Sequence, residues 1–133
     1  MRMTAKQYRS RARQPRSKYN NKKVTLDGIT FDSKAEARYY KELQLRQRVG
    51  DIQFFRLQPR YQVHEKFEKD GKNHQAIFYI ADFEIHHNDG SIETVDVKGM
   101  KTEVFRIKEK LFNKKFPHKL TLVKWERGRF VEI

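Results

Sequence analysis

Three charged residues in the second half of this 133-residue chain have types and spacing suited to metal-assisted phosphate chemistry. Asp82 is followed, after thirteen residues, by Asp96, and Lys98 comes two positions later. Two carboxylates held close together repel each other unless they are protonated or share a cation. A divalent ion in that place polarises a phosphodiester and lowers the pKa of a bound water, and a lysine beside it stabilises the charge of the reacting phosphate. An exposed ion pair between strands is the plainer interpretation of the same three residues.

The segment between the two aspartates decides whether they meet. It contains Asn88-Asp89-Gly90, a sequence typical of a tight hairpin loop. If all three residues form the loop, with Gly90 in the left-handed conformation, Asp82 lies directly opposite Asp96. A two-residue loop would instead place the aspartates on opposite faces. The three-residue loop is favoured because it also collects one apolar face, made of Ala81, Phe83, Ile85, Val95 and Val97.

Turn signals and apolar periodicity predict the elements that must position these residues. The predicted order is a hairpin at 24–31, a helix at 34–49 that begins after Ser33, strands at 52–57, 61–67, 75–87 and 91–98, a helix at 103–115, and strands at 120–125 and 130–133. Two helices separated by several strands indicate a mixed α/β domain.

Charge is concentrated at the N-terminus. The formal net charge is +13, and residues 1–23 carry nine Lys and Arg but no Asp or Glu. We therefore expect a flexible basic arm at residues 1–21 and one folded domain at residues 22–133. A cationic arm suits a polyanion such as DNA, although a merely soluble basic surface has the same composition.

The composition also excludes several classes of site. The chain has no cysteine, so disulfides and thiolate metal sites are excluded, and any metal must take oxygen or imidazole ligands. The longest apolar run, residues 76–81, falls far short of the roughly 20 residues that span a bilayer. We expect no membrane association and a cytoplasmic location.

The motif residues resemble a known signature. Ala81-Asp82 followed by Asp96-Val97-Lys98 is similar to the PD-(D/E)xK signature of the restriction-endonuclease-like superfamily, with Ala81 where the signature has proline. Further strings, from Lys18-Tyr19-Asn20 through Leu57-Gln58-Pro59 to Lys110-Leu111-Phe112, resemble small phage and prophage members over roughly residues 18–125. The resemblance implies a restriction-endonuclease-like mixed β-sheet flanked by helices (an α-β-β-β-α-β core) in a phage or prophage protein of a bacterial host cell.

The resemblance also implies a catalytic site. Asp82, Asp96 and the carbonyl of Val97 would hold Mg²⁺, for which Mn²⁺ can substitute, and Lys98 would act on the attacking water or the phosphate. The first helix of such proteins commonly adds a carboxylate, which corresponds here to Glu36, as a catalytic residue and a further metal ligand. A purely structural interpretation is also open, because Ser33-Lys34-Ala35-Glu36 has the pattern of a helix capping box.

Candidate DNA contacts lie outside this cluster. They are Gln58, Lys101, Arg106, Lys108 and Lys110. Lys108 is expected in the apolar arc of the second helix, from which its ammonium either reaches water or reaches the scissile phosphate. The five histidines are interpreted as structural or surface residues.

Three functions remain open. The leading hypothesis is a metal-dependent endonuclease that cuts branched DNA as a homodimer, like a Holliday-junction resolvase in phage recombination, repair or replication. A nicking or end-processing subunit that depends on a partner is the second hypothesis. A non-catalytic DNA-binding protein is the third.

Overall fold

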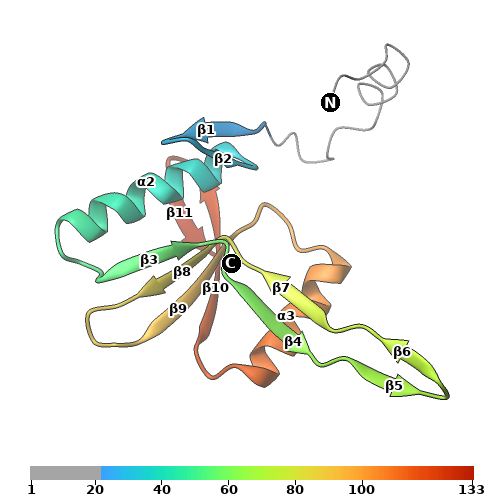
Figure 1. Ribbon diagram of the computed structural model, residues 1–133. Coiled ribbons are helices and arrows are strands. Elements are labelled where there is room, and N and C mark those ends of the chain that lie inside the picture. Colours follow the sequence, from blue (N-terminus) through green and yellow to red (C-terminus); the bar gives the residue numbers. More distant parts are fainter. Residues whose placement is uncertain (1–21) are drawn as a thin grey trace, which may run out of the picture.

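The computed structural model describes residues 22–133 and has the predicted α/β class, with two helices and a mixed sheet (Figure 1). The arm predicted for residues 1–21 lies outside the described residues. The elements are β1 (Val24–Leu26), β2 (Ile29–Phe31), α2 (Lys34–Arg48), β3 (Phe54–Leu57), β4 (Arg60–His64), β5 (Phe67–Lys69), β6 (Lys72–His74), β7 (Ile77–Ile80), β8 (Phe83–His86), β9 (Ile92–Val97), α3 (Glu103–Lys115), β10 (Lys119–Glu126) and β11 (Arg129–Glu132).

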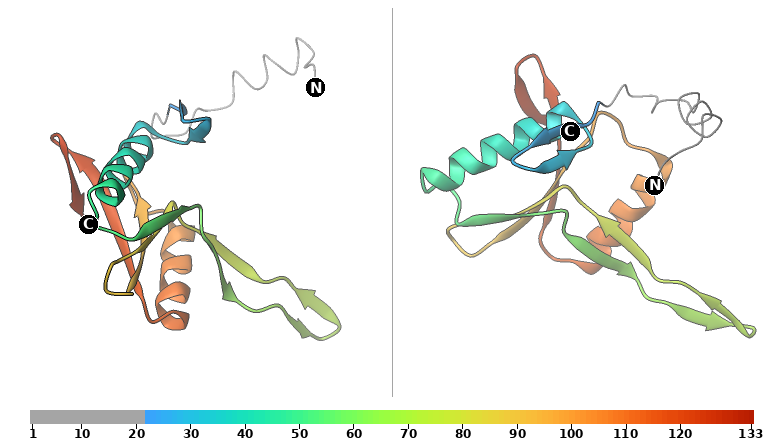
Figure 2. Two further views of the ribbon diagram at one scale, coloured as in Figure 1. Left: turned by 60° about the vertical axis from the view of Figure 1, so that its left-hand side comes forward. Right: turned by 45° about the horizontal axis from the view of Figure 1, so that its top comes forward.

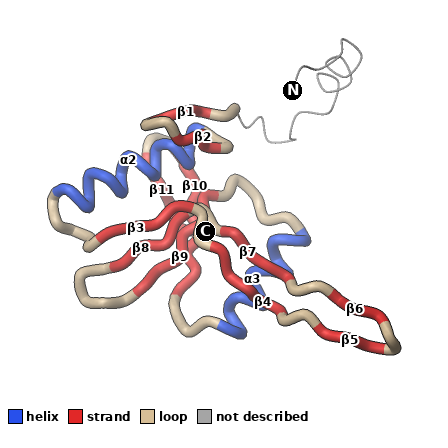
Figure 3. Tube along the Cα trace, viewed as in Figure 1, coloured by secondary structure: helices blue, strands red, loops and turns tan. Residues whose placement is uncertain are grey.

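The central sheet has five strands in the order β11-β10-β9-β8-β3 (Figure 3). Strands β9 and β10 are parallel and are joined by α3, whereas the other neighbours are antiparallel. A parallel pair needs such a crossover connection.

Within the described residues, no helix is long and apolar enough to cross a membrane.

The two helices pack on opposite faces of the sheet, and β9 contributes side chains to both faces. Val95 faces α2, where it joins Tyr39, Leu43 and Phe83 in one buried cluster. A second buried cluster lies on the α3 side and contains Tyr61, Tyr79, Ala81, Phe105, Phe112 and Leu122. Side chains alternate along a strand, so Thr94 and Asp96 point away from Val95, toward the α3 face. Both are also buried.

Helix α2 begins and ends within one residue of the prediction. The hydroxyl of Ser33 accepts a hydrogen bond from the backbone N–H of Glu36 at 3.1 Å, which satisfies a donor of the first turn. After the C-cap Val49, Gly50 has a φ of +84°, a conformation that favours glycine and ends the helix.

The hairpin register predicted between the aspartates is confirmed. Phe83 pairs with Val95 and His86 with Ile92, the pairing that a three-residue loop produces. Gly90 has a φ of +87°, as that loop requires.

The prediction of one continuous strand at 75–87 is wrong. The strand breaks at Ala81, so β7 pairs with β4, while β8 pairs with β3 and β9. The neighbouring strand bends at the same level, because Gln58 has a φ of +49° and its N–H donates to the carbonyl of Asp82. Both strands thus leave the sheet together as a ribbon that packs on α3, and Ala81 lies in the α3 cluster rather than with Phe83. Asp82 stands at the junction.

Candidate functional site

The structure brings Asp82 and Asp96 together at the junction where the ribbon leaves the sheet. Asp96 lies in β9 and is only 2% exposed, and Asp82 directly precedes β8, one position beyond the Phe83–Val95 pair. The pKa of Asp82 is raised well above its usual value by burial, by a hydrogen bond with Asp96, and by the charges of Asp96 and Glu36. Protonation of Asp82 relieves the repulsion between the two carboxyl groups, and a cation can take the place of that proton.

Neighbouring groups fix the orientation of both carboxyl groups. Oδ2 of Asp82 accepts a hydrogen bond from the backbone N–H of Val97 at 2.8 Å. Oδ2 of Asp96 accepts one from the hydroxyl of Tyr79 at 2.6 Å. Burial and the charge of Asp96 raise the pKa of Tyr79, so its hydroxyl remains a donor. One oxygen of each aspartate is thus held by the protein.

Sequence reasoning missed Tyr79. The residue lies in the apolar run 76–81 and was treated as part of a strand without chemistry. A signal was present, because a tyrosine in a buried strand usually has a hydrogen-bond partner for its hydroxyl. Its partner lies in β9, and the sequence could not show that β7 and β9 approach each other without pairing.

Lys98 lies beside the acidic pair, as predicted. Its ammonium nitrogen is 3.4 Å from Oδ2 of Asp96, and its side chain is 29% exposed. The same nitrogen lies 4.6 Å from the ring centroid of Phe105, within the range of a cation–π interaction. Its backbone N–H donates to the carbonyl of Val123, which extends the pairing of β9 with β10. The lysine is therefore held at the mouth of the site by backbone, ring and carboxylate.

The backbone of Glu36 takes part in the cap of α2, and its side chain lies near the candidate site. The cap hydrogen bond uses the N–H of Glu36 and the hydroxyl of Ser33. The pKa of the carboxyl group is raised to about 7, first by burial, then by the charge of Asp32, with a further contribution from Asp96. A hydrogen bond with the backbone of Asp32 and, less strongly, the charge of Lys98 lower it. These interactions place the Glu36 carboxyl in the electric field of Asp96 and Lys98. Capping and a role in the site are compatible.

The oxygen donors present suit a hard divalent cation that keeps most of its water. Among residues 22–133, no three Asp, Glu or His side chains are arranged to hold a metal ion together. Two carboxylates, with the carbonyl of Val97 as a further ligand, match Mg²⁺, which usually takes only one or two carboxylates from a protein and keeps several waters. Glu36 is near enough to interact with the pair electrostatically without completing a three-carboxylate cluster.

The candidate DNA contacts are divided between the site and α3. Gln58 is exposed and adjoins Asp82 through its backbone hydrogen bond. Lys101 forms an ion pair with Glu109 at 3.5 Å. Arg106 and Lys110 are exposed, and Lys108 is half-buried. The structure thus brings the backbone of Gln58 to Asp82, and it leaves Arg106 and Lys110 exposed on α3.

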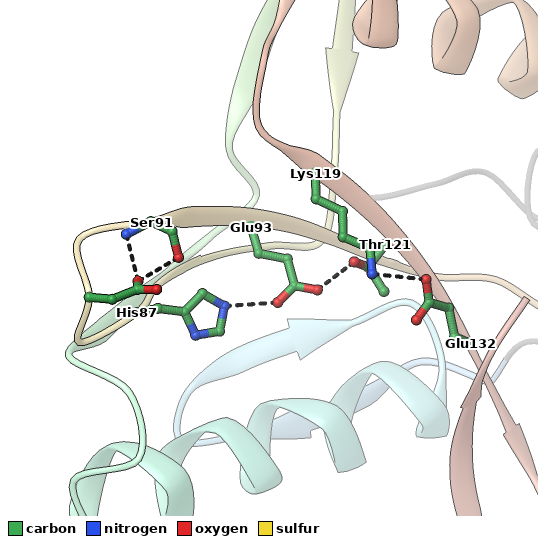
Figure 4. Close-up of polar contacts among 7 residues, drawn as sticks. His87, Ser91, Glu93, Lys119, Thr121 and Glu132 are labelled. Atoms are coloured by element: carbon green, nitrogen blue, oxygen red, sulfur yellow. Dashed lines mark hydrogen bonds and ion pairs between the residues drawn. The ribbon is translucent and has the colours of Figure 1, made fainter.

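A polar cluster at the other end of β9 involves one of the histidines (Figure 4). Nε2 of His87 lies 2.9 Å from Glu93, which also accepts a hydrogen bond from Thr121. Glu93 is at the start of β9 and Lys98 follows its end, so this cluster is remote from the aspartates. His86 contacts Glu84 and His118 contacts Thr94. These contacts agree with the structural interpretation of the histidines.

Fold and site define an α/β protein with a mixed five-stranded sheet and a buried acidic pair, next to a lysine, at the point where a β-ribbon leaves the sheet. The chain belongs to the family described as "Protein of unknown function (DUF1064)", whose model matches residues 16–127. None of the curated proteins compared with the chain matches it.

Proposed function

We propose that this protein is a Mg²⁺-dependent DNA endonuclease that hydrolyses phosphodiester bonds. The observation that carries the proposal is the geometry of three residues on or next to the neighbouring strands β8 and β9. Asp82 and Asp96 share a partly dehydrated junction, and the ammonium of Lys98 lies 3.4 Å from Asp96. An ion pair that served stability alone would gain little from two adjacent carboxyl groups, because the repulsion between them opposes folding.

The order of elements supports a restriction-endonuclease-like core. Along the chain, the elements of the central sheet and its helices are α2, β3, β8, β9, α3 and β10. This is the α-β-β-β-α-β order that the resemblance implies, with β4 to β7 inserted as a ribbon between the first two strands. The positions of the candidate residues also support the proposal, because Glu36 lies on the first helix, Asp82 directly precedes the second strand and Asp96 lies on the third.

Each candidate site residue has a separate role in the proposed reaction. Asp82, Asp96 and the Val97 carbonyl would hold Mg²⁺ or Mn²⁺, and the ion would supply a Lewis acid that polarises the phosphate. Lys98, held by Asp96 and Phe105, donates hydrogen bonds to a phosphate oxygen and stabilises the charge of the transition state. Glu36, with a pKa of about 7, accepts a proton from the attacking water near neutral pH.

DNA is the proposed substrate because of the charge of the chain. The net charge of +13 favours a polyanion, and each phosphate contact made by a lysine or arginine releases condensed counterions. We further propose a preference for branched DNA, as in Holliday-junction resolvases. Two incisions on two strands require two sites, which a symmetric homodimer provides.

The test is a cleavage assay with labelled four-way junction, linear duplex and single strand of the same sequence, in Mg²⁺ or in EDTA. Wild type is compared with Asp82→Asn and Lys98→Ala, and with the matched controls Asp51→Asn and Lys124→Ala, which change exposed residues. Cleavage that needs Mg²⁺ and disappears in the first two variants, but not in the controls, supports the proposal. Tight DNA binding without cleavage of any substrate contradicts it and favours a non-catalytic DNA-binding protein.

A further inference from the structure

The ribbon formed by β4 to β7 extends well beyond the body of the molecule (Figures 1 and 2). Its inner half is anchored, because Tyr61 and Tyr79 pack against Phe112 of α3. Its outer half, β5 and β6, packs chiefly on itself. A two-stranded ribbon without further support is at best marginally stable in water. The outer half of the ribbon therefore contributes little to the stability of the domain, so stability does not explain its presence.

A groove of about 650 Å³ runs between this ribbon and the C-terminal half of α3. We call it the ribbon groove and define it by its lining residues Val63, His64, Glu65, Lys66, Phe67, Leu111, Lys114 and Lys115. Three of these residues are lysines and one is a glutamate, so the groove is cationic. All three lysines are exposed. Lys66 lies between β4 and β5 on the ribbon side of the groove, and Lys114 and Lys115 lie in the last turn of α3.

An aromatic platform lies at the outer end of the groove. The side chain of Phe67 is 47% exposed, and its ring stacks on His74 with centroids 4.6 Å apart and planes 11° apart. A flat, exposed aromatic surface beside cationic side chains is characteristic of nucleic-acid contacts, in which lysines meet phosphates and rings meet bases or sugars. A surface for an apolar protein partner would not need the three lysines.

The ribbon that forms one side of the groove begins at the candidate active site. The carbonyl of Pro59 accepts a hydrogen bond from the N–H of Ala81, next to Asp82, so the ribbon starts at the acidic pair. Lys66 lies six residues beyond Arg60, about 20 Å along an extended chain at roughly 3.3 Å per residue. That length corresponds to about six base steps of a duplex, at roughly 3.4 Å per step.

We propose that the ribbon groove binds the phosphodiester backbone of the DNA arm that leaves the active site, about six base pairs from the scissile phosphate. Lys66, Lys114 and Lys115 contact the phosphates, and Phe67 packs against the strand. The inference rests on the proposed function for its substrate, but it assigns a binding surface that can be measured without cleavage.

The test uses the full chain in EDTA and measures the dissociation constant for a fluorescent duplex over a series of salt concentrations. The double variant Lys66→Ala, Lys114→Ala is compared with the control Lys41→Ala, Lys124→Ala, which removes two exposed lysines elsewhere. Each lost phosphate contact lowers the slope of log affinity against log salt by about 0.9, so the groove variant should lose about 1.8. The control should keep the wild-type slope.

Cleavage assays in Mg²⁺ then separate the two proposals. A slope lost in the groove variant supports the ribbon groove even if wild type cuts nothing. If wild type and the groove variant both cut DNA and have the same salt dependence of DNA affinity, the proposed DNA-binding role of the groove is wrong and the proposed nuclease activity stands. A groove variant that changes a monomer–dimer equilibrium in sedimentation, with its DNA slope intact, also overturns the proposal, because the groove is then a contact between protein copies.

Discussion

The hydroxyl of Tyr79 donates a 2.6 Å hydrogen bond to Oδ2 of Asp96 across the boundary between two sheets. Tyr79 belongs to β7, which pairs with β4, whereas Asp96 belongs to β9 of the central sheet. The two strands approach each other here without exchanging backbone hydrogen bonds. This contact therefore connects the root of the ribbon to the acidic pair and orients the more deeply buried carboxylate.

Replacement of Tyr79 by phenylalanine should slow cleavage without unfolding the domain. The ring that packs on Phe105 and Phe112 remains, but Asp96 loses one donor and its orientation. We expect a loss of about tenfold in kcat, of the order of one lost hydrogen bond to a charged group, with DNA affinity in EDTA unchanged. Tyr39→Phe, an equally buried change on the α2 face, is the control. Equal kcat values in both variants would contradict a positioning role for Tyr79.

Replacement of Asp82 by asparagine should stabilise the metal-free protein at pH 8 while it abolishes cleavage. The folded-state pKa of Asp82 is raised above the ordinary value of 3.8, first by burial. The contribution of such a group to stability is fully present below that ordinary value and is lost as pH rises through the raised pKa. The neutral amide avoids this loss and can still accept the hydrogen bond from Val97.

Thermal unfolding at two pH values measures this effect. We expect Asp82→Asn to gain about 1 kcal/mol at pH 8, equivalent to roughly 4 °C in Tm for a domain of this size, and to match wild type at pH 4. The exposed change Asp51→Asn should alter Tm at neither pH. A lower Tm for Asp82→Asn at pH 8 would show that the charged form of Asp82 is stabilising.

Local signals in the sequence were sufficient for most of the fold. The cap at Ser33, the turn at Asp27-Gly28 and the left-handed Gly90 each set an element boundary or a register within a few residues of chain. The position of Asp82 next to Asp96 followed from that register alone. Such features are local, because a turn or a cap depends on residues that are adjacent in sequence.

The break at Ala81 could not be predicted in the same way. It arises because β7 packs on α3 and pairs with β4, and these contacts join residues that are far apart in sequence. Without them, residues 75–87 have the alternation of a single strand. The same long-range packing brings Tyr79 to Asp96 and forms the ribbon groove, so both features became visible in the structure and not in the sequence.

The two roles of Glu36 predict different results for two substitutions. Ser33→Ala removes the hydroxyl that accepts the N–H of Glu36, so the domain should lose about 1 kcal/mol of stability and keep its cleavage rate at temperatures well below Tm. Glu36→Gln keeps that cap, because the cap uses the backbone, and should slow cleavage by about a hundredfold if the carboxylate acts as a general base. If Ser33→Ala cleaves DNA slowly and Glu36→Gln cleaves it at the wild-type rate, Glu36 acts in the helix cap alone.

Binding of Mg²⁺ should raise the Tm of wild type and leave the Tm of the two aspartate variants unchanged. A ligand that binds only the folded state stabilises it by RT ln(1 + [L]/Kd), about 1.4 kcal/mol at tenfold the dissociation constant. Asp82→Asn and Asp96→Asn each remove one of the two carboxylates proposed as ligands, so neither should respond to the ion. Glu36→Gln should keep most of the wild-type shift in Tm, because Glu36 interacts with the acidic pair without forming a three-carboxylate cluster with it. Equal shifts in Tm for all four proteins would place the bound ion elsewhere. Addition of EDTA is the control, because it should return wild type to its original Tm if the metal causes the shift.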